Sequence, residues 1–142
     1  MPADLTGTWK LLAWRRIAAD GTVTHPIGDD AGGLLVYTAN GRMIVQLVAS
    51  GRPELDSSDP LGGDVEVRAR LYSTCLAYFG TYELRDDTVL HRIEMSLYPG
   101  WSGDGQERYY SVEGDELTLR TPPMTGANAG TVNELAWRRE AA

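Results

Sequence analysis

The sequence is poor in cysteine, and it has no long apolar run. Cys75 is the one cysteine among 142 residues, so the chain has no internal disulfide, and the thiol fits a reducing compartment. We interpret Cys75 as a buried structural thiol rather than a nucleophile, because no base stands near it in the sequence. The first ten residues lack the pattern of a signal peptide, and no stretch approaches the roughly 18 apolar residues of a membrane-spanning helix. We therefore expect a cytoplasmic protein without a membrane partner.

Positive charge, metal ligands and catalytic motifs are also scarce. The net charge is −7 and the sequence pI is about 4.7, so the surface repels phosphate backbones and nucleic acid is not an expected partner. His25 and His91 have no second ligand at metal-binding spacing. Gly103-Asp104-Gly105 lacks the strand-to-helix context of a phosphate loop, and no G-x-S-x-G motif is present. The sequence therefore predicts no metal and no cofactor.

β-Structure and turns are what the composition favours. Sixteen glycines, seven tyrosines and four tryptophans are typical of strands joined by tight turns. The Asn40-Gly41 pair between two β-rich runs is a strong hairpin signal, because both residues tolerate positive φ. Alternating apolar residues and turn signals predict eight strands, within residues 5–19, 32–50 (two strands), 80–85, 88–97, 106–113, 116–121 and 131–139.

One segment has helical rather than alternating spacing. Between residues 64 and 79, apolar side chains recur at helical intervals, and Asp64 can cap the first turn. The sequence thus predicts an all-β single domain over residues 1–142, with one helix (about 64–79) between the third and fourth strands. An eight-stranded antiparallel up-and-down meander is expected to close into a barrel, because closure removes exposed edges. Such a barrel holds side chains or one small ligand.

Short turns indicate which residues face the barrel interior. Two-residue turns at Asp86-Asp87 and Gly114-Asp115 pair Tyr82 with His91 and Val112 with Leu117. After Leu97 the connection is longer and leaves two registers open, of which we prefer the one that gathers the apolar residues on one face. The predicted inner face is then Tyr82, Leu84, Val89, His91, Ile93, Met95, Leu97, Gln106, Arg108, Tyr110, Val112, Leu117, Leu119 and Thr121.

Several short motifs resemble, in their order and spacing, the small bacterial and fungal lipocalin-like domain family. They are Gly7-Thr8-Trp9-Lys10-Leu11, Gly33–Tyr37, Tyr78–Tyr82, His91-Arg92-Ile93, Pro99–Gly103, Arg108-Tyr109 and Trp137-Arg138-Arg139. The resemblance spans nearly the full chain. It implies a barrel with a ligand-sized cavity, and a late basic residue packed on the tryptophan that closes one end. It does not imply one activity, since members range from unassigned binders to proteins encoded near natural-product pathways.

Three hypotheses for function follow. In the first, the barrel binds a small, largely apolar, natural-product-like molecule through a polar anchor from Arg108, His91 and tyrosines. In the second, the same pocket is a cofactor-free cyclase, isomerase or lyase for a polyketide- or terpenoid-like substrate. Arg108 or a tyrosine would then stabilise an oxyanion while His91 moves a proton. In the third, the barrel is filled and only its surface acts. In each case we expect a monomer or homodimer.

Each candidate residue also has a structural interpretation. The candidate catalytic residues are His91, Arg108 and Tyr110. The candidate ligand-binding residues are Tyr37, Tyr82, Met95, Tyr98, Trp101 and Gln106. His91 could instead bond Tyr82 or backbone, and Arg108 could pack on Trp9 or pair with Glu134, since a buried arginine needs a partner, water or a ligand. Tyr98 and Trp101 form either a rim at the pocket or a plug of the barrel end.

Overall fold

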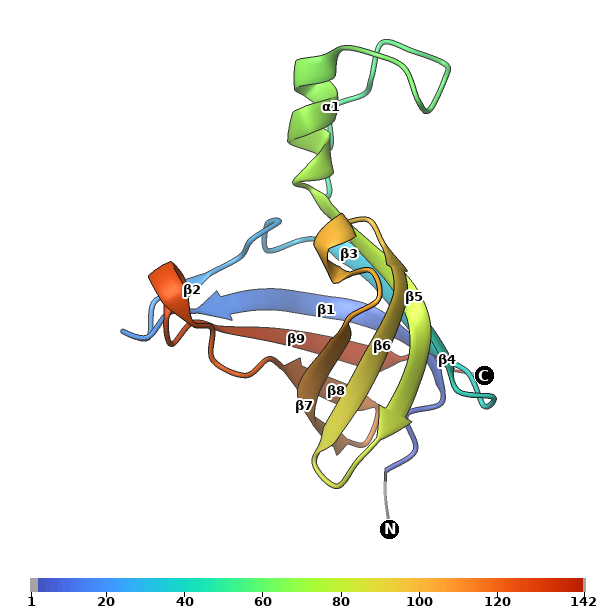
Figure 1. Cartoon of the computed structure of the whole chain (residues 1–142), viewed down its shortest axis with the longest axis vertical. Coiled ribbons are helices and arrows are strands. Elements are labelled where there is room, and N and C mark those ends of the chain that lie inside the picture. The colour runs from blue at the N-terminus through green and yellow to red at the C-terminus, as the bar shows by residue number, and fades with distance from the viewer. Residues whose placement is uncertain (1–2, 142) are drawn as a thin grey trace.

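The computed structural model describes residues 3–141, in which nine strands form one antiparallel sheet that closes on itself (Figure 1). The order of neighbouring strands is β2-β1-β3-β4-β5-β6-β7-β8-β9, and β1 also pairs with β9. The strands are β1 (Gly7–Ile17), β2 (Val23–Thr24), β3 (Gly32–Tyr37), β4 (Arg42–Val48), β5 (Cys75–Leu84), β6 (Thr88–Ser96), β7 (Gly105–Glu113), β8 (Glu116–Arg120) and β9 (Val132–Arg139). The predicted eight-stranded barrel is confirmed, with β2 as a short addition on β1. Residues 1, 2 and 142 of the predicted single domain lie outside the described residues.

The helix differs from its prediction in length and in place. Helix α1 (Val65–Tyr72) follows the fourth strand rather than the third, because residues 23–24 form the extra strand β2. The Asp64 carboxylate caps it as predicted, accepting the Val67 N–H at 3.1 Å. Residues 75–79, expected to be helical, instead begin β5 and pair with β4. Periodicity over so short an apolar run does not separate a helix from a strand. Figure 1 shows α1 standing off one end of the barrel.

The predicted hairpin registers are confirmed. Tyr82 is opposite His91 across β5 and β6, and Val112 is opposite Leu117 across β7 and β8. Gln106 of β7 is opposite His91 of β6, so the preferred register across the longer connection is also confirmed. These local turns therefore bring His91, Gln106 and Arg108 to one face of the sheet.

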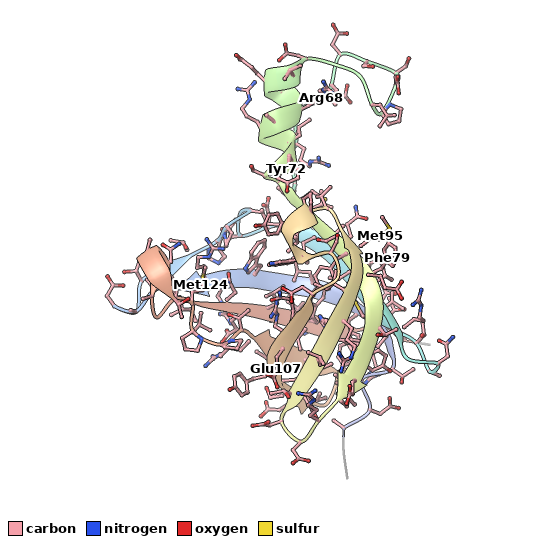
Figure 2. The ribbon with its side chains drawn as sticks, viewed as in Figure 1. Arg68, Tyr72, Phe79, Met95, Glu107 and Met124 are labelled. Carbon is pink, nitrogen blue, oxygen red and sulfur yellow. The ribbon has the colours of Figure 1, made fainter. Side chains whose placement is uncertain are left out.

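A β-bulge near the end of β6 overturns one part of the predicted inner face. Phe79 of β5 pairs with Met95, but the next residue, Gly80, pairs with Ile93, so Glu94 has no partner across the pair. An extra residue reverses the in-out alternation beyond it. Met95 is therefore 63% exposed and lies beside Phe79 on the outer surface (Figure 2). The prediction that Met95 faces the interior is wrong.

Trp9 closes one end of the barrel, as the family resemblance implies. Its ring is fully buried, and its indole N–H donates to the Leu5 carbonyl at 2.9 Å. The Arg139 guanidinium lies 4.2 Å from the ring centroid, which is a cation–π contact. Arg139 also donates to the carbonyls of Asp4 and Thr6. The late basic residue is thus Arg139, and this end is sealed by packing and hydrogen bonds.

Candidate functional site

The barrel holds a cavity of about 510 Å³ that opens toward the end beside α1. Most of its wall is apolar, including Ile27, Leu35, Val45, Leu47, Leu76, Leu119 and Leu135. Tyr72, at the base of α1, and Met124 border it from separate elements (Figure 2). An apolar cavity with a few polar groups is typical of small-molecule sites. The hypothesis of a barrel filled by its own side chains is therefore wrong.

His91 is a fully enclosed polar group of the wall. It is 1% exposed and lies between two tyrosines: its Nε2 is 2.6 Å from the Tyr37 hydroxyl, and its Nδ1 is 2.7 Å from the Tyr78 hydroxyl. Burial, and then the charge of Arg108, lower the pKa of His91 from 6.5 to about 3. The imidazole is therefore neutral near pH 7. Its predicted hydrogen bond to Tyr82 is wrong, since the Tyr82 hydroxyl donates to the Thr38 carbonyl.

The flanking tyrosines are held in their neutral form as well. Burial raises the pKa of Tyr78, and it raises the pKa of Tyr37 well above 10. Each phenol therefore keeps its O–H proton near neutral pH. The three side chains come from β3, β5 and β6, which are separate strands of the barrel. The group is a chain of three neutral, hydrogen-bonded side chains.

Arg108 reaches the cavity wall without a carboxylate partner among residues 3–141. Its Nη1 donates to the Glu107 carbonyl at 3.0 Å and to the Gln106 side chain at 3.4 Å. Glu134, its predicted partner, forms ion pairs with Arg15 and Arg120 instead. Its predicted packing on Trp9 is also wrong, because Arg139 occupies that position. Both structural interpretations of Arg108 therefore fail, and its charge is available to the cavity.

The other predicted site residues divide into two groups. Gln106, Tyr98 and Trp101 line the cavity. Trp101 makes edge contacts with Tyr98 (5.5 Å between ring centroids) and with Tyr78 (6.0 Å). Tyr98 and Trp101 therefore lie together at the mouth of the cavity. The structure does not bring Tyr82, Tyr110 or Met95 to the wall, and Tyr37 reaches the site only through His91. The Tyr110 hydroxyl donates to the Asp86 carbonyl, at 3.4 Å.

The cavity wall also contains residues that are not among the sequence-based candidates, and two of them carry polar groups that bear on the site. Tyr78 falls inside the predicted helix, which gives it no strand face, although it belongs to the motif Tyr78–Tyr82. Trp137 was interpreted only as part of the closing motif. Its side chain is buried and lines the cavity, and its indole nitrogen has no hydrogen-bond partner in the described chain. Strand parity would have indicated both residues.

The charge of the wall is opposite to that of the protein. The chain carries a net charge of −7. Arg16 and Arg108 line the cavity, whereas no Asp or Glu of the described residues does so. Arg16 and the Trp14 indole both donate to the Asn133 side-chain oxygen. The cavity is thus a donor-rich, cationic interior in an acidic protein.

Comparison with known proteins agrees with this architecture. Residues 6–140 match the model of the lipocalin-like domain family. The chain belongs to this family. A relative, the 4'-hydroxy-3'-methoxypropiophenone carrier protein ppsC of Aspergillus oryzae, is 32% identical over 106 residues, which cover 68% of this chain and 96% of that protein. A crystal structure of a protein from Bacteroides eggerthii shares the fold of this lipocalin-like chain at 14% identity, with a TM-score of 0.50, covering 96% of this chain and 100% of that one.

Within residues 3–141, no group of three or more His, Cys, Asp and Glu side chains is placed to hold a metal ion. None of the helices that the structure describes is long and apolar enough to cross a membrane.

Buried His91 predicts a pH dependence of stability. Between pH 6.5 and about 3, the unfolded chain binds a proton at His91 that the folded chain does not bind. Stability therefore falls as the pH falls through this window, and we expect His91 to contribute a loss of about 1 kcal/mol between about pH 6 and about pH 5. Urea unfolding at both pH values measures this change in the free energy of unfolding.

Two variants isolate the contribution of His91. The pH-dependent loss should disappear in a variant that combines H91L, Y37F and Y78F, in which the whole polar group is apolar. It should persist in H25Q, because His25 is exposed. The lowered pKa of Glu134, held down first by its hydrogen bond with Arg120, acts below 4.5 and lies outside this range. An unchanged pH dependence in the triple variant would contradict the assignment.

Proposed function

We propose that the protein is a carrier that binds a small, largely apolar, natural-product-like molecule inside the barrel and releases it unchanged. The observation that carries the proposal is the apolar cavity, with Arg108 on its wall and no carboxylate beside it in the described chain. Arg108 and the Tyr78–His91 pair would anchor the polar part of the ligand. The Aspergillus oryzae relative is named as a carrier of 4'-hydroxy-3'-methoxypropiophenone, which supports an aryl ketone as the first ligand to test.

The enzymatic alternative receives less support from the same geometry. A cofactor-free cyclase, isomerase or lyase acting on a polyketide- or terpenoid-like substrate would need a group that moves a proton near the working pH. His91 has a pKa of about 3, and both of its ring nitrogens already have partners. Arg108 could stabilise an oxyanion, but no base beside it in the described chain is suited to move the proton. We therefore favour binding without chemistry.

Replacement of Arg108 tests the proposed anchor. We expect R108M to raise the Kd for 4'-hydroxy-3'-methoxypropiophenone by about tenfold to 100-fold, because a hydrogen bond from a charged donor contributes about 1.5–3 kcal/mol. Isothermal titration calorimetry measures the Kd. The matched control is R92M, since Arg92 is exposed and pairs with Glu83 away from the cavity. Equal binding by R108M and the wild type would contradict the anchor.

The fate of the ligand separates the two functions. After incubation with the wild type, mass spectrometry should recover the ketone unchanged. A changed mass or an isomerised product would favour the enzyme. If the wild type binds neither this ketone nor other small apolar aromatic compounds, the proposed carrier function is wrong.

A further inference from the structure

The group of Tyr37, His91 and Tyr78 has one proton more than its own hydrogen bonds use. A neutral imidazole has one N–H donor and one acceptor nitrogen, and each phenol has one O–H. The three side chains therefore carry three polar protons, but only two hydrogen bonds join them. One O–H must point away from the group. Its direction depends on which ring nitrogen of His91 is protonated.

One tautomer leaves a proton without an acceptor in the core. If Nε2 carried the proton, it would donate to Tyr37, and the Tyr37 O–H would need another acceptor. Tyr37 is 1% exposed, and its hydroxyl has no other partner among the described residues. A buried donor without a partner costs about 1–3 kcal/mol. This tautomer is therefore disfavoured.

The other tautomer places the free proton in the cavity. If Nδ1 carries the proton, Tyr37 donates to Nε2, and Nδ1–H donates to the Tyr78 oxygen. The remaining O–H then belongs to Tyr78, which lines the cavity, whereas Tyr37 does not. Hydrogen bonds arranged in one direction also polarise each other, which strengthens the last donor.

We propose that the hydrogen bonds run from Tyr37 through His91 to Tyr78, and that Tyr78 donates its O–H to a carbonyl oxygen of the bound molecule. The proposal rests on the proposed binding function and names its ligand class: an apolar molecule with a carbonyl acceptor, such as an aryl ketone. Hydrocarbons and protonated amines offer no acceptor and would leave the donor unused.

A separate feature of the wall indicates the same polarity. The Trp137 indole N–H is a buried donor without a partner in the part of the chain that the structure describes. It lies on β9, which is opposite β5 in the strand order of the closed barrel. Arg108 adds further N–H donors. A ligand that offers acceptor oxygens would match the Arg108 donors, whereas the Trp137 N–H itself is enclosed by protein atoms.

The first test reads the tautomer directly and needs no ligand. In ¹⁵N-labelled H25Q protein, His91 is the one remaining histidine. Long-range ¹H–¹⁵N correlation spectra at neutral pH should show a protonated Nδ1 and an unprotonated Nε2. A protonated Nε2 would overturn the proposed direction of the chain. Because H25Q changes only an exposed side chain, the cavity is unaltered.

The second test compares two ligands of similar shape. They are 4'-hydroxy-3'-methoxypropiophenone and its analogue in which a CH₂ group replaces the ketone. The wild type should bind the ketone about tenfold more tightly, the effect of about one hydrogen bond. Y78F should lose most of this preference. The control Y109F should keep it, because Tyr109 is exposed on β7.

The outcomes separate the two proposals. If the wild type binds both compounds equally, or if Y78F keeps the full preference, the assignment of Tyr78 is wrong while the carrier function stands. If neither compound binds, the carrier function fails, and the ligand class fails with it. A Y78F protein that does not fold leaves the tautomer measurement and the wild-type preference as the deciding results.

Discussion

Gly80→Ala is expected to lower the free energy of unfolding by about 3 kcal/mol or more, because the new methyl group would collide with a neighbouring strand. A Cβ at this position would lie 1.9 Å from the Arg92 carbonyl oxygen and 3.0 Å from the Glu94 nitrogen. Both are main-chain atoms of β6 at the bulge, so no side-chain rotation can relieve the contact. The Gly80 backbone does not have a positive φ, so the expected effect is steric rather than conformational.

Two other glycines provide matched controls. A Cβ at Gly32 would meet nothing within 4 Å, and one at Gly105 would lie 3.4 Å from the end of the Leu90 side chain. We expect G32A and G105A to change stability by less than about 1 kcal/mol, since neither meets a rigid obstacle. Urea unfolding at one pH compares the three variants. A G80A protein as stable as these controls would show that β5 and β6 do not approach so closely.

His91→Leu is expected to destabilise the protein by about 2–4 kcal/mol. The substitution removes the partner of two tyrosine hydroxyls, and each buried hydroxyl without a partner costs about 1–3 kcal/mol. The cost should be larger at Tyr37, which is enclosed, than at Tyr78, which borders the cavity and can turn to water there. Urea unfolding at neutral pH gives the change in the free energy of unfolding.

Replacing all three side chains should recover most of this loss. In the variant that combines H91L, Y37F and Y78F this group contains no hydroxyl, and replacing both partners of a hydrogen bond by apolar groups can be nearly neutral. We expect its stability to lie within about 1 kcal/mol of the wild type, which is a strong departure from additivity between contacting residues. Cumulative destabilisation in the triple variant would contradict this account and would indicate that packing dominates.

Local turns explain why much of the barrel could be predicted from the sequence. A two-residue turn determines which residues pair beside it, and pairing determines which face each side chain takes. The shared face of His91, Gln106 and Arg108 follows from such local rules. The packing of a late basic residue on Trp9 came from the family resemblance rather than from spacing.

The features that could not be predicted depend on contacts between segments that are distant in the sequence. The partners of His91 come from β3 and β5, and no pattern near His91 specifies them. The bulge at Glu94 has one local indication, the glycine opposite it, but a strand glycine does not say where an extra residue is inserted. Glu134 pairs with Arg15 and Arg120 rather than Arg108 because its neighbour Leu135 takes the inward position.

The helix beside the entrance of the cavity is weakly anchored to the barrel. Of α1, only Leu71 is buried, whereas Tyr72 at its end borders the cavity. Burial of one leucine contributes about 1.5–3 kcal/mol, so detaching the helix costs far less than separating two strands of a closed barrel. In the proposed carrier, loading and unloading would then need only a local opening, in which every barrel strand keeps its neighbours. The rate of ligand exchange and the melting temperature of the barrel then become properties that mutation can change independently.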